Sequence, residues 1–210
     1  MSLLRLEIEP HDPPSARKIA RAVEVLDRGG VAAYPTDTVY ALGCALDARK
    51  AVERVYRARD MAAKHRLAMI CPDVSAAAHY AHFNQVAFRV ARAIFPGPFT
   101  MVLPATREVP RQLWEDKRRR VIGIRVPAHP VTRALVNELG RPLLTSSAVP
   151  NDSEVACTDA DELIEAFGRH LDLIVDSGPI HGEPSTVIEI EDDEIVVIRQ
   201  GAGSLDDVAL

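Results

Sequence analysis

The sequence is poor in cysteine and lacks a long apolar run. Its 210 residues include 3 Cys, and Cys44, Cys71 and Cys157 are widely spaced without a CxxC pair, which excludes a zinc ribbon and a CxxC redox motif. A membrane span needs roughly 18 consecutive apolar residues, so we expect no membrane-spanning segment. Acidic residues interrupt the N-terminal ten residues where a signal peptide would need an apolar stretch, so we expect a cytoplasmic protein.

Several common catalytic and nucleotide-binding signatures are also absent. The chain has no GxxxxGK[ST] phosphate loop, no GxGxxG after a strand and no GxSxG nucleophile turn. No Cys/His cluster has metal-ligand spacing, so we predict no protein-bound metal site. The formal net charge of -5 argues against nucleic-acid binding driven by total charge, although a local basic surface stays open.

The pattern of apolar and turn residues predicts an α/β fold. Helices and strands alternate early and strands cluster late, which favours a twisted mixed sheet with helices packed on it in a single domain, 1–210. Strands are expected at 4–8, 31–34, 67–71, 99–104, 121–126, 143–146, 173–175, 186–190 and 195–198, the last two forming a hairpin through 192–193. Helices are expected at 15–28, 47–59, 74–80, 84–95, 131–139 and 159–167, with a helical turn at 110–114. In this scheme Ser15, Asp47 and Asn84 cap helices, and Gly140 ends one.

A cluster of hydroxyls and one carboxylate follows the strand at 31–34. The segment 34–40 reads Tyr-Pro-Thr-Asp-Thr-Val-Tyr. Ligands in open α/β sheets bind outside the carboxyl ends of strands, so the hydroxyls of Thr36 and Thr38 are candidate ligand contacts. An ordinary turn with threonines bonded to its backbone explains the pattern equally simply.

Arginines supply the second candidate feature. Arg57 and Arg59 lie at the end of a predicted helix, where they either converge on an anion or form a solvated basic helix end. Arg125 lies inside a strand and therefore needs a partner, which is either a carboxylate or a bound anion. The basic run 117–120 is by default a solvated loop, with a nucleic-acid contact as the alternative.

Hydroxyls at the end of the strand 143–146 form the third feature. Thr145 and Ser146 end an apolar strand and suit hydrogen bonding to phosphate or ribose, or capping of the next segment.

Taken in order, these segments resemble the YrdC-type threonylcarbamoyl-AMP synthase family, from about residue 15 to residue 203. The matching stretches are GVAAYPTDTVYALG at 30–43, FPGPFT at 95–100, VIGIRVPAHP at 121–130, PSTVI at 184–188 and RQG at 199–201. Three shorter segments, 40–44, 84–88 and 108–111, are most similar to the YciO branch of that family.

The resemblance implies a YrdC/RibB-like twisted sheet with a concave basic cavity. It implies an enzyme that condenses L-threonine, bicarbonate and ATP to threonylcarbamoyl-AMP and pyrophosphate, for modification of adenosine 37 in tRNA. Mg²⁺ would accompany the nucleotide, and double-stranded RNA or tRNA would be a possible partner. No covalent nucleophile is expected, and no side chain is assigned as a catalytic group.

By position, the resemblance also implies site residues. Thr36, Arg59, His65 and Arg125 would contact the substrates, with Arg125 on the threonine carboxylate. The residues implied to bind the nucleotide are Arg57, Thr145, Ser146, Ser185 and Arg199.

Two positions depart from the family pattern. Where the family has Lys-x-Arg, this chain has Arg57-Ala58-Arg59, and an arginine fork is not equivalent to an ammonium group. Where the family has Ser-x-Asn, this chain has Ser146-Ser147-Ala148. Two alternatives to a synthase therefore stay open: an RNA-binding protein without synthase activity, and a hydrolase of threonylcarbamoyl-AMP.

Overall fold

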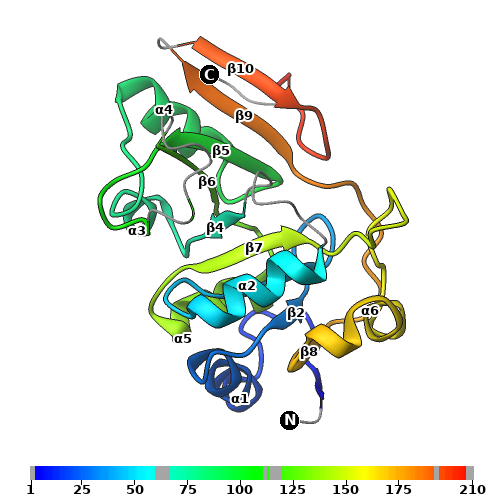
Figure 1. Ribbon diagram of the computed structural model, residues 1–210. Coiled ribbons are helices and arrows are strands. Elements are labelled where there is room, and N and C mark those ends of the chain that lie inside the picture. The colour runs from blue at the N-terminus through cyan, green and yellow to red at the C-terminus, as the bar shows by residue number, and fades with distance from the viewer. Residues whose placement is uncertain (1–2, 60–66, 111–112, 114–119, 192–193, 207–210) are drawn as a thin grey trace.

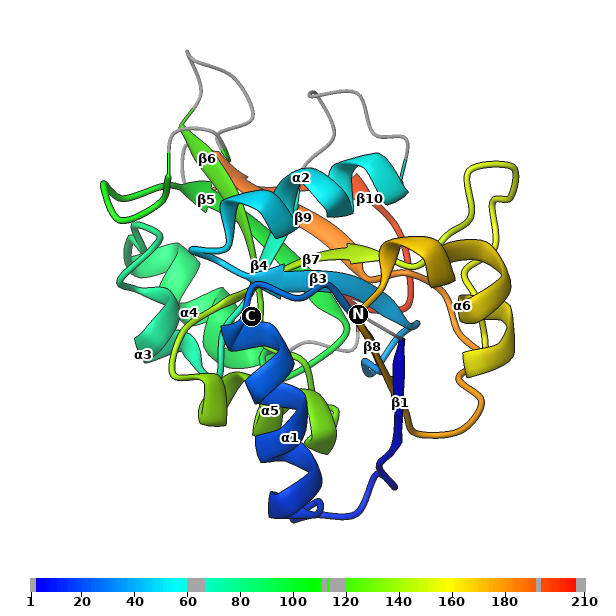
Figure 2. The same cartoon turned by 60° about the horizontal axis from the view of Figure 1, so that its bottom comes forward.

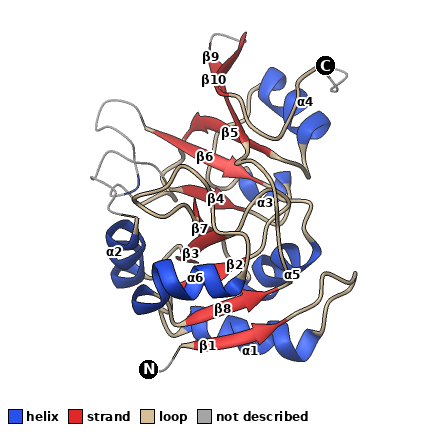
Figure 3. Cartoon of the chain, turned by 90° about the vertical axis from the view of Figure 1, so that its right-hand side faces the viewer, coloured by secondary structure: helices blue, strands red, loops and turns tan. Residues whose placement is uncertain are grey.

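The computed structural model describes residues 3–59, 67–110, 113, 120–191 and 194–206. These residues form a ten-stranded sheet in the order β1-β8-β2-β3-β7-β4-β6-β5-β9-β10. Parallel and antiparallel pairs are mixed, for example β1 parallel to β8 and β3 antiparallel to β7. Figure 3 shows the strands running from β1, near the N-terminus, to the β9–β10 hairpin at the opposite end.

The strands are β1 (Leu4–Glu7), β2 (Ala32–Tyr34), β3 (Ala41–Ala45), β4 (Ala68–Ile70), β5 (Phe99–Pro104), β6 (Val121–Arg125), β7 (Leu143–Ser147), β8 (Leu173–Asp176), β9 (Thr186–Glu191) and β10 (Glu194–Arg199). The helices are α1 (Ala16–Asp27), α2 (Arg49–Ala58), α3 (Val74–Ala77), α4 (Gln85–Ile94), α5 (Pro130–Leu139) and α6 (Ala160–Phe167), followed by the 3₁₀ turn η2 (Gly168–His170). None of the helices in this described part is long and apolar enough to cross a membrane.

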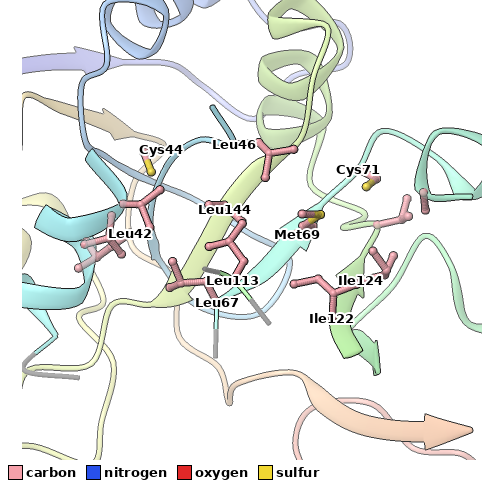
Figure 4. Close-up of a cluster of buried hydrophobic side chains, with 14 of the residues drawn as sticks. Leu42, Cys44, Leu46, Leu67, Met69, Cys71, Leu113, Ile122, Ile124 and Leu144 are labelled. Carbon is pink, nitrogen blue, oxygen red and sulfur yellow. The ribbon is translucent and has the colours of Figure 1, made fainter. Parts of the chain in front are cut away.

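Helices cover both faces of the sheet. Figure 2 shows β3 and β7 between α2 on one side and the neighbouring helices α1 and α5 on the other. One group of buried side chains joins α1 and α5 to the sheet and includes Ile19, Leu26 and Leu135. A larger group lies under α2, α4 and α6, and Figure 4 shows part of it around Met69 and Leu144. Apolar burial on both faces stabilises the sheet.

The predicted class of a twisted mixed sheet with packed helices is confirmed, but one strand was not predicted and two predicted helix caps make no capping hydrogen bond. The strand β3 was not predicted, because Ala41–Ala45 is buried at every position and shows no alternation of apolar and polar residues. The N-cap residue of α2 is Ala48 rather than Asp47, whose carboxylate accepts a hydrogen bond from Arg141 Nε at 2.9 Å. Ser15 stands at the N-cap of α1, but its side chain makes no capping hydrogen bond.

Other helix boundaries follow the sequence signals. Asn84 Oδ1 accepts a hydrogen bond from Ala87 N at 2.7 Å, which confirms the predicted cap of α4. Gly140 ends α5 with φ of 68°, a left-handed conformation that glycine adopts without a steric cost. Most of the helical turn predicted at 110–114, and the turn predicted at 192–193, lie outside the described residues.

Candidate functional site

A cavity of about 470 Å³ opens above the middle of the sheet. Its floor contains Ala68 on β4, with Gly123 on β6 and Thr145 on β7 as its register partners, so the three residues share one face. Gly123 has no side chain, and a Cβ built there would lie 3.1 Å from Thr100 Cγ2 and 3.2 Å from Ala68 Cβ. A side chain at this position would crowd Thr100 and Ala68, so glycine keeps this part of the cavity floor free of a side chain.

The cavity walls come from segments that are far apart in the sequence. In Figure 1 the strands that supply lining residues extend from β7 through β4, β6 and β5 to the β9–β10 hairpin, and Arg59 is added from the end of α2. The described lining residues are Arg59, Leu67, Ala68, Thr100, Val102, Gly123, Arg125, Thr145, Ser146, Ser147, Val149, Pro184, Ser185, Val187, Ile198 and Arg199.

Arg125, at the end of β6, is held by the loop that follows β2. Its Nη2 group lies 2.6 Å from Asp37 Oδ1, 2.6 Å from Thr38 Oγ1 and 3.2 Å from Thr36 Oγ1. Arg125 is only 4% exposed, and its buried Nε group has no hydrogen-bond partner among the described residues. A buried N–H group without a partner costs free energy, so the cavity side of this guanidinium is suited to a ligand acceptor.

The loop that holds Arg125 is itself rigidly bonded. Thr36 Oγ1 donates to Val39 O at 2.6 Å and accepts from the backbone N–H groups of Thr38 and Val39, each at 3.2 Å. The second oxygen of Asp37 accepts from Ala128 N at 3.0 Å, which ties this loop to the segment after β6. The threonines and the aspartate therefore position Arg125 instead of facing open solvent.

Arg59 approaches the cavity from the C-terminal end of α2. Its Nε group donates to Ser146 Oγ at 3.3 Å, and its buried Nη1 group has no hydrogen-bond partner among the described residues. Burial lowers the pKa of Arg59, because desolvation disfavours the charged form. A bound anion would offset that cost.

Arg199 closes the cavity from β10. Its Nη2 group donates to Ser185 O at 2.8 Å, and Ser185 Oγ lies 2.8 Å from Thr100 Oγ1. Partial burial lowers the pKa of Arg199, and the nearby charge of Arg125 lowers it further. Two guanidinium groups close enough to repel each other favour an anion between them.

The structure brings six of the nine predicted site residues to this cavity. They are Arg59, Arg125, Thr145, Ser146, Ser185 and Arg199. Their ligand contacts stay predictions. The sequence left open whether Arg125 pairs with a carboxylate or with a bound anion. In the structure it forms an ion pair with Asp37 and also lines the cavity.

Three predicted residues are not brought there. Thr36 is buried beneath Arg125 and does not line the cavity. Arg57 lies on the exposed side of α2 and donates to Glu53 O at 3.3 Å, because residues two apart on a helix face different directions. His65 lies outside the described residues, as do 117–119 of the basic run 117–120.

The sequence analysis missed three residues of the site. Asp37 belongs to the polar cluster expected after the strand 31–34, but its ion pair with the buried arginine in β6 was not predicted. Thr100 lies in a predicted strand and in the FPGPFT stretch, but it was not assigned to the site. Gly123 inside a strand is a signal of an open or closely approached surface and could have pointed to the cavity floor.

The described residues build no metal site into this cavity. Its described lining residues include no carboxylate, histidine or cysteine. Across the described part of the chain, no group of three or more such side chains could hold a metal ion. The donor set does not fit a protein-bound Mg²⁺, which prefers carboxylate oxygens.

A larger hollow, about 590 Å³, lies between α6 and the segment 150–158. Its lining includes none of the predicted site residues, and its charged side chains, Asp152, Glu162, Glu165 and Arg169, are exposed. We therefore place the candidate site at the arginine-lined cavity, where buried polar groups converge.

Fold and cavity together define an α/β protein with a mixed sheet and an arginine-lined cavity. The family model Sua5_yciO_yrdC, described as "Telomere recombination", matches residues 24–201. The chain belongs to this Sua5/YciO/YrdC family. The family and the YciO branch expected from the sequence are thereby confirmed.

The chain is similar in sequence both to a YciO protein and to a threonylcarbamoyl-AMP synthase. YciO of Escherichia coli K12 is 40% identical over 194 residues, which cover 92% of this chain and 94% of YciO. A threonylcarbamoyl-AMP synthase of Halorhodospira halophila is 34% identical over 166 residues, which cover 78% of this chain and 85% of the synthase.

Solved structures agree with this assignment. The crystal structure of E. coli YciO superimposes with a TM-score of 0.89 at 38% identity, covering 98% of each chain. The crystal structure of P. abyssi Sua5 complexed with L-threonine superimposes with a TM-score of 0.86 at 27% identity. That match covers 99% of this chain but 59% of Sua5.

Proposed function

We propose that this protein binds ATP and L-threonine in the arginine-lined cavity and condenses them with bicarbonate to threonylcarbamoyl-AMP. The observation that carries this proposal is the convergence of Arg59, Arg125 and Arg199, together with several hydroxyl groups, on one cavity. Guanidinium groups suit phosphates and carboxylates, which are the charged groups of these two substrates. The H. halophila synthase and the threonine complex of P. abyssi Sua5 support the same substrates.

The proposed reaction needs positioning and charge neutralisation more than a protein nucleophile. The threonine amine and bicarbonate form a carbamate with loss of water. A carbamate oxygen then bonds to the α-phosphorus of ATP, the bond from that phosphorus to the bridging oxygen breaks, and pyrophosphate leaves with the electron pair. Arginines that hold the carboxylate and the phosphates bring the reactants together and stabilise the developing charge.

The three cysteines take no part in this reaction. Cys44, Cys71 and Cys157 are all buried, and burial raises the pKa of each thiol. None of them lines the cavity. Mg²⁺ would arrive with the triphosphate and offset part of its charge, and we assign no side chain to it.

The departures from the family pattern favour a second candidate activity, hydrolysis of threonylcarbamoyl-AMP. Ala148, at the position of the family's asparagine, is fully buried, and its backbone N–H donates to Tyr40 O at 2.8 Å. A pocket without that amide could bind threonylcarbamoyl-AMP and let water attack it, which would make the protein a hydrolase. RNA binding through 117–120 also stays a prediction.

Pyrophosphate release from ATP tests the proposed synthase. We expect release that requires both threonine and bicarbonate, and at least a tenfold loss in Arg59→Ala, because a buried charged contact is removed. Arg57→Ala is the matched control, since Arg57 lies two residues away on the exposed face of α2, and it should keep its activity. Release that is indifferent to threonine and bicarbonate would overturn the synthase.

Two further assays on the same purified protein test the hydrolase and the RNA-binding alternatives. Loss of added threonylcarbamoyl-AMP in the absence of ATP would identify the hydrolase. Salt-dependent binding of double-stranded RNA that weakens when 117–120 are neutralised would identify an RNA-binding protein.

A further inference from the structure

The two edge strands of the sheet differ in how they are protected from pairing with another chain. β1 at one edge has four residues, and the exposed side chains of Arg5 and Glu7 alternate with its apolar ones. Short length and charged side chains are common ways of keeping an edge strand unpaired. β10 at the other edge has six residues, and the four in its middle, 195–198, are all apolar. Of the two edges, β10 is therefore the one suited to accept a further strand.

The apolar side chains of β10 are also exposed. Val196, Val197 and Ile198 are 42%, 45% and 46% exposed, and they are three of the six large apolar side chains that are strongly exposed among the described residues. β10 pairs with β9 on one side, and in the described part of the chain its backbone makes no hydrogen bond on the other side. Figure 1 shows β10 as the outermost strand of the hairpin. Such a strand favours association through its free backbone groups.

An irregularity in β10 decides which way its charged side chains face. Positions 194–197 pair with β9 in regular antiparallel register, but the register shifts between Val197 and Arg199. Ile198 is therefore an extra residue in the strand, as in a β-bulge. Because side chains alternate along a strand, Glu194 and Arg199 would face opposite sides of the sheet without this extra residue. With it, both face the same side, which is the side of the cavity that Arg199 lines.

We propose that β10 pairs with β10 of a second copy of this chain, antiparallel and about a two-fold axis at Val196. A two-fold axis between antiparallel strands keeps each side chain on its own face of the sheet, so only residues that face the same side can lie opposite each other. In the proposed register Val196 lies opposite its own copy and Ile195 lies opposite Val197. Glu194 lies opposite Arg199, and the bulge is what makes this pairing possible.

The proposed register is complementary in charge and in apolar contact. The symmetry brings a Glu194 carboxylate opposite an Arg199 guanidinium twice, and directly opposite residues have Cβ atoms about 4.5–5.5 Å apart. Apolar side chains occupy every position between these two pairs. A shift of two residues in either direction would place Glu194 or Arg199 opposite Val196, and both charge pairs would be lost. Because β10 is complementary to itself, a second copy is favoured over an unrelated peptide as the partner.

The proposed pairing also reaches the candidate site. Arg199 lines the cavity and donates to Ser185 O at 2.8 Å, so Glu194 of the second copy would lie beside a residue of the cavity wall. One strand of six residues from each copy is small compared with the roughly 20–30 residues per partner of a standard stable interface. We therefore expect a reversible dimer that forms as the protein concentration rises.

Sedimentation velocity of the purified full chain over a series of concentrations tests the proposal. We expect a monomer–dimer equilibrium that shifts toward monomer as salt is raised, because two charge pairs contribute. Val196→Lys places two like charges opposite each other on the axis and should raise the dissociation constant of the dimer about tenfold or more. Val155→Lys is the matched control, since Val155 is an exposed valine in the loop before α6, and it should leave the equilibrium unchanged.

Charge reversal tests the register itself. Glu194→Arg and Arg199→Glu should each weaken the dimer, because like charges then lie opposite each other. The double variant Glu194→Arg/Arg199→Glu should return the dissociation constant to within about threefold of the original value. Thermal unfolding shows whether each variant is folded. If Arg199→Glu does not fold, Glu194→Arg and Val196→Lys decide, because both change exposed side chains at the sheet edge.

Several results would overturn the proposal. They are a monomer at every concentration, a dimer that Val196→Lys leaves intact, and a double variant that does not recover from the losses of the two single variants. Growth beyond two copies would contradict a pairing that closes at the dimer. A chain that stays monomeric but binds an extended peptide along β10 would contradict a second copy as the partner. None of these measurements involves turnover, so a dimer without synthase activity and an active monomer are distinguishable results.

Discussion

Arg59 Nε and Ser146 Oγ meet at 3.3 Å, although 87 positions separate them in the sequence. Arg59 lies just beyond α2 and Ser146 lies in β7, so this contact joins a helix end to the sheet at the cavity wall. It fixes one edge of a guanidinium whose buried Nη1 group is left for a ligand.

The first prediction concerns this contact. Ser146→Ala removes the hydrogen bond that orients Arg59, so pyrophosphate affinity should fall by about tenfold, the usual scale for a hydrogen bond to a charged group. Calorimetry with pyrophosphate measures the change. Ser153→Ala is the control, since Ser153 bonds only within its own loop. Equal affinities in the two variants would contradict the orienting role.

The second prediction concerns close packing at Gly43 in β3. A Cβ atom there would lie 2.2 Å from Leu144 O and 2.6 Å from the Tyr34 hydroxyl. Gly43→Ala should therefore lower the free energy of unfolding by about 3 kcal/mol, because backbone must move to accommodate the methyl group. Urea denaturation measures the loss. Gly168→Ala is the control, since its nearest neighbour would be 3.6 Å away, and it should change stability little.

The third prediction concerns Tyr40, which links β3 to the turn after β8. Its hydroxyl donates to Gly178 O at 2.7 Å and accepts from Ser177 N at 3.1 Å. Tyr40→Phe should lower the free energy of unfolding by about 1–3 kcal/mol, because two partly buried backbone groups lose their partner. Tyr56→Phe, which removes a hydroxyl without a hydrogen bond to the described residues, should have a much smaller effect in the same urea experiment. Similar losses in both variants would show that the hydroxyl contacts do not matter.

The fourth prediction concerns pH. Burial raises the pKa of the Cys44 and Cys71 thiols from 9.0 to about 12. Between pH 9 and pH 12 the thiols lose their protons in the unfolded chain but keep them in the folded chain. The contribution of the buried thiols to the free energy of unfolding is therefore fully present below about pH 9 and is lost as the pH rises toward 12. Burial also raises the pKa of Tyr40, from 10.0 to about 12, which acts in the same direction.

Denaturation curves at a series of pH values from neutral to alkaline measure this dependence. A thiol reagent provides the check at neutral pH, where all three cysteines should react slowly in the folded protein and rapidly in urea. Rapid reaction of Cys44 and Cys71 in the folded protein would contradict their burial.

Much of the secondary structure was predictable because its signals are local. Asn84 caps α4 and Gly140 ends α5 as predicted, since capping depends on side chains within one turn. β3 was missed because both of its faces are buried, so its sequence has no periodic pattern to recognise. Asp47 was assigned to the wrong role because Arg141, 94 positions away, takes its carboxylate.

The candidate site was predictable in part. Hydroxyls and arginines near strand ends were identified from the sequence, and the resemblance to a family assigned ligands to them. The sequence could not tell that Arg57 faces away from Arg59, nor that Thr36 is buried under Arg125. Both outcomes depend on how a helix end and a loop pack against the sheet.

The sequence by itself determined the α/β class, the family, most helix and strand positions and the residue types that could bind an anion. These follow from short-range patterns of apolar side chains, turns and caps. Only the tertiary structure decided that Arg59, Arg125 and Arg199 share one cavity, and that Asp37 compensates just one of them. Charges separated by tens of residues interact through space, and their distances are set by the order and twist of the strands.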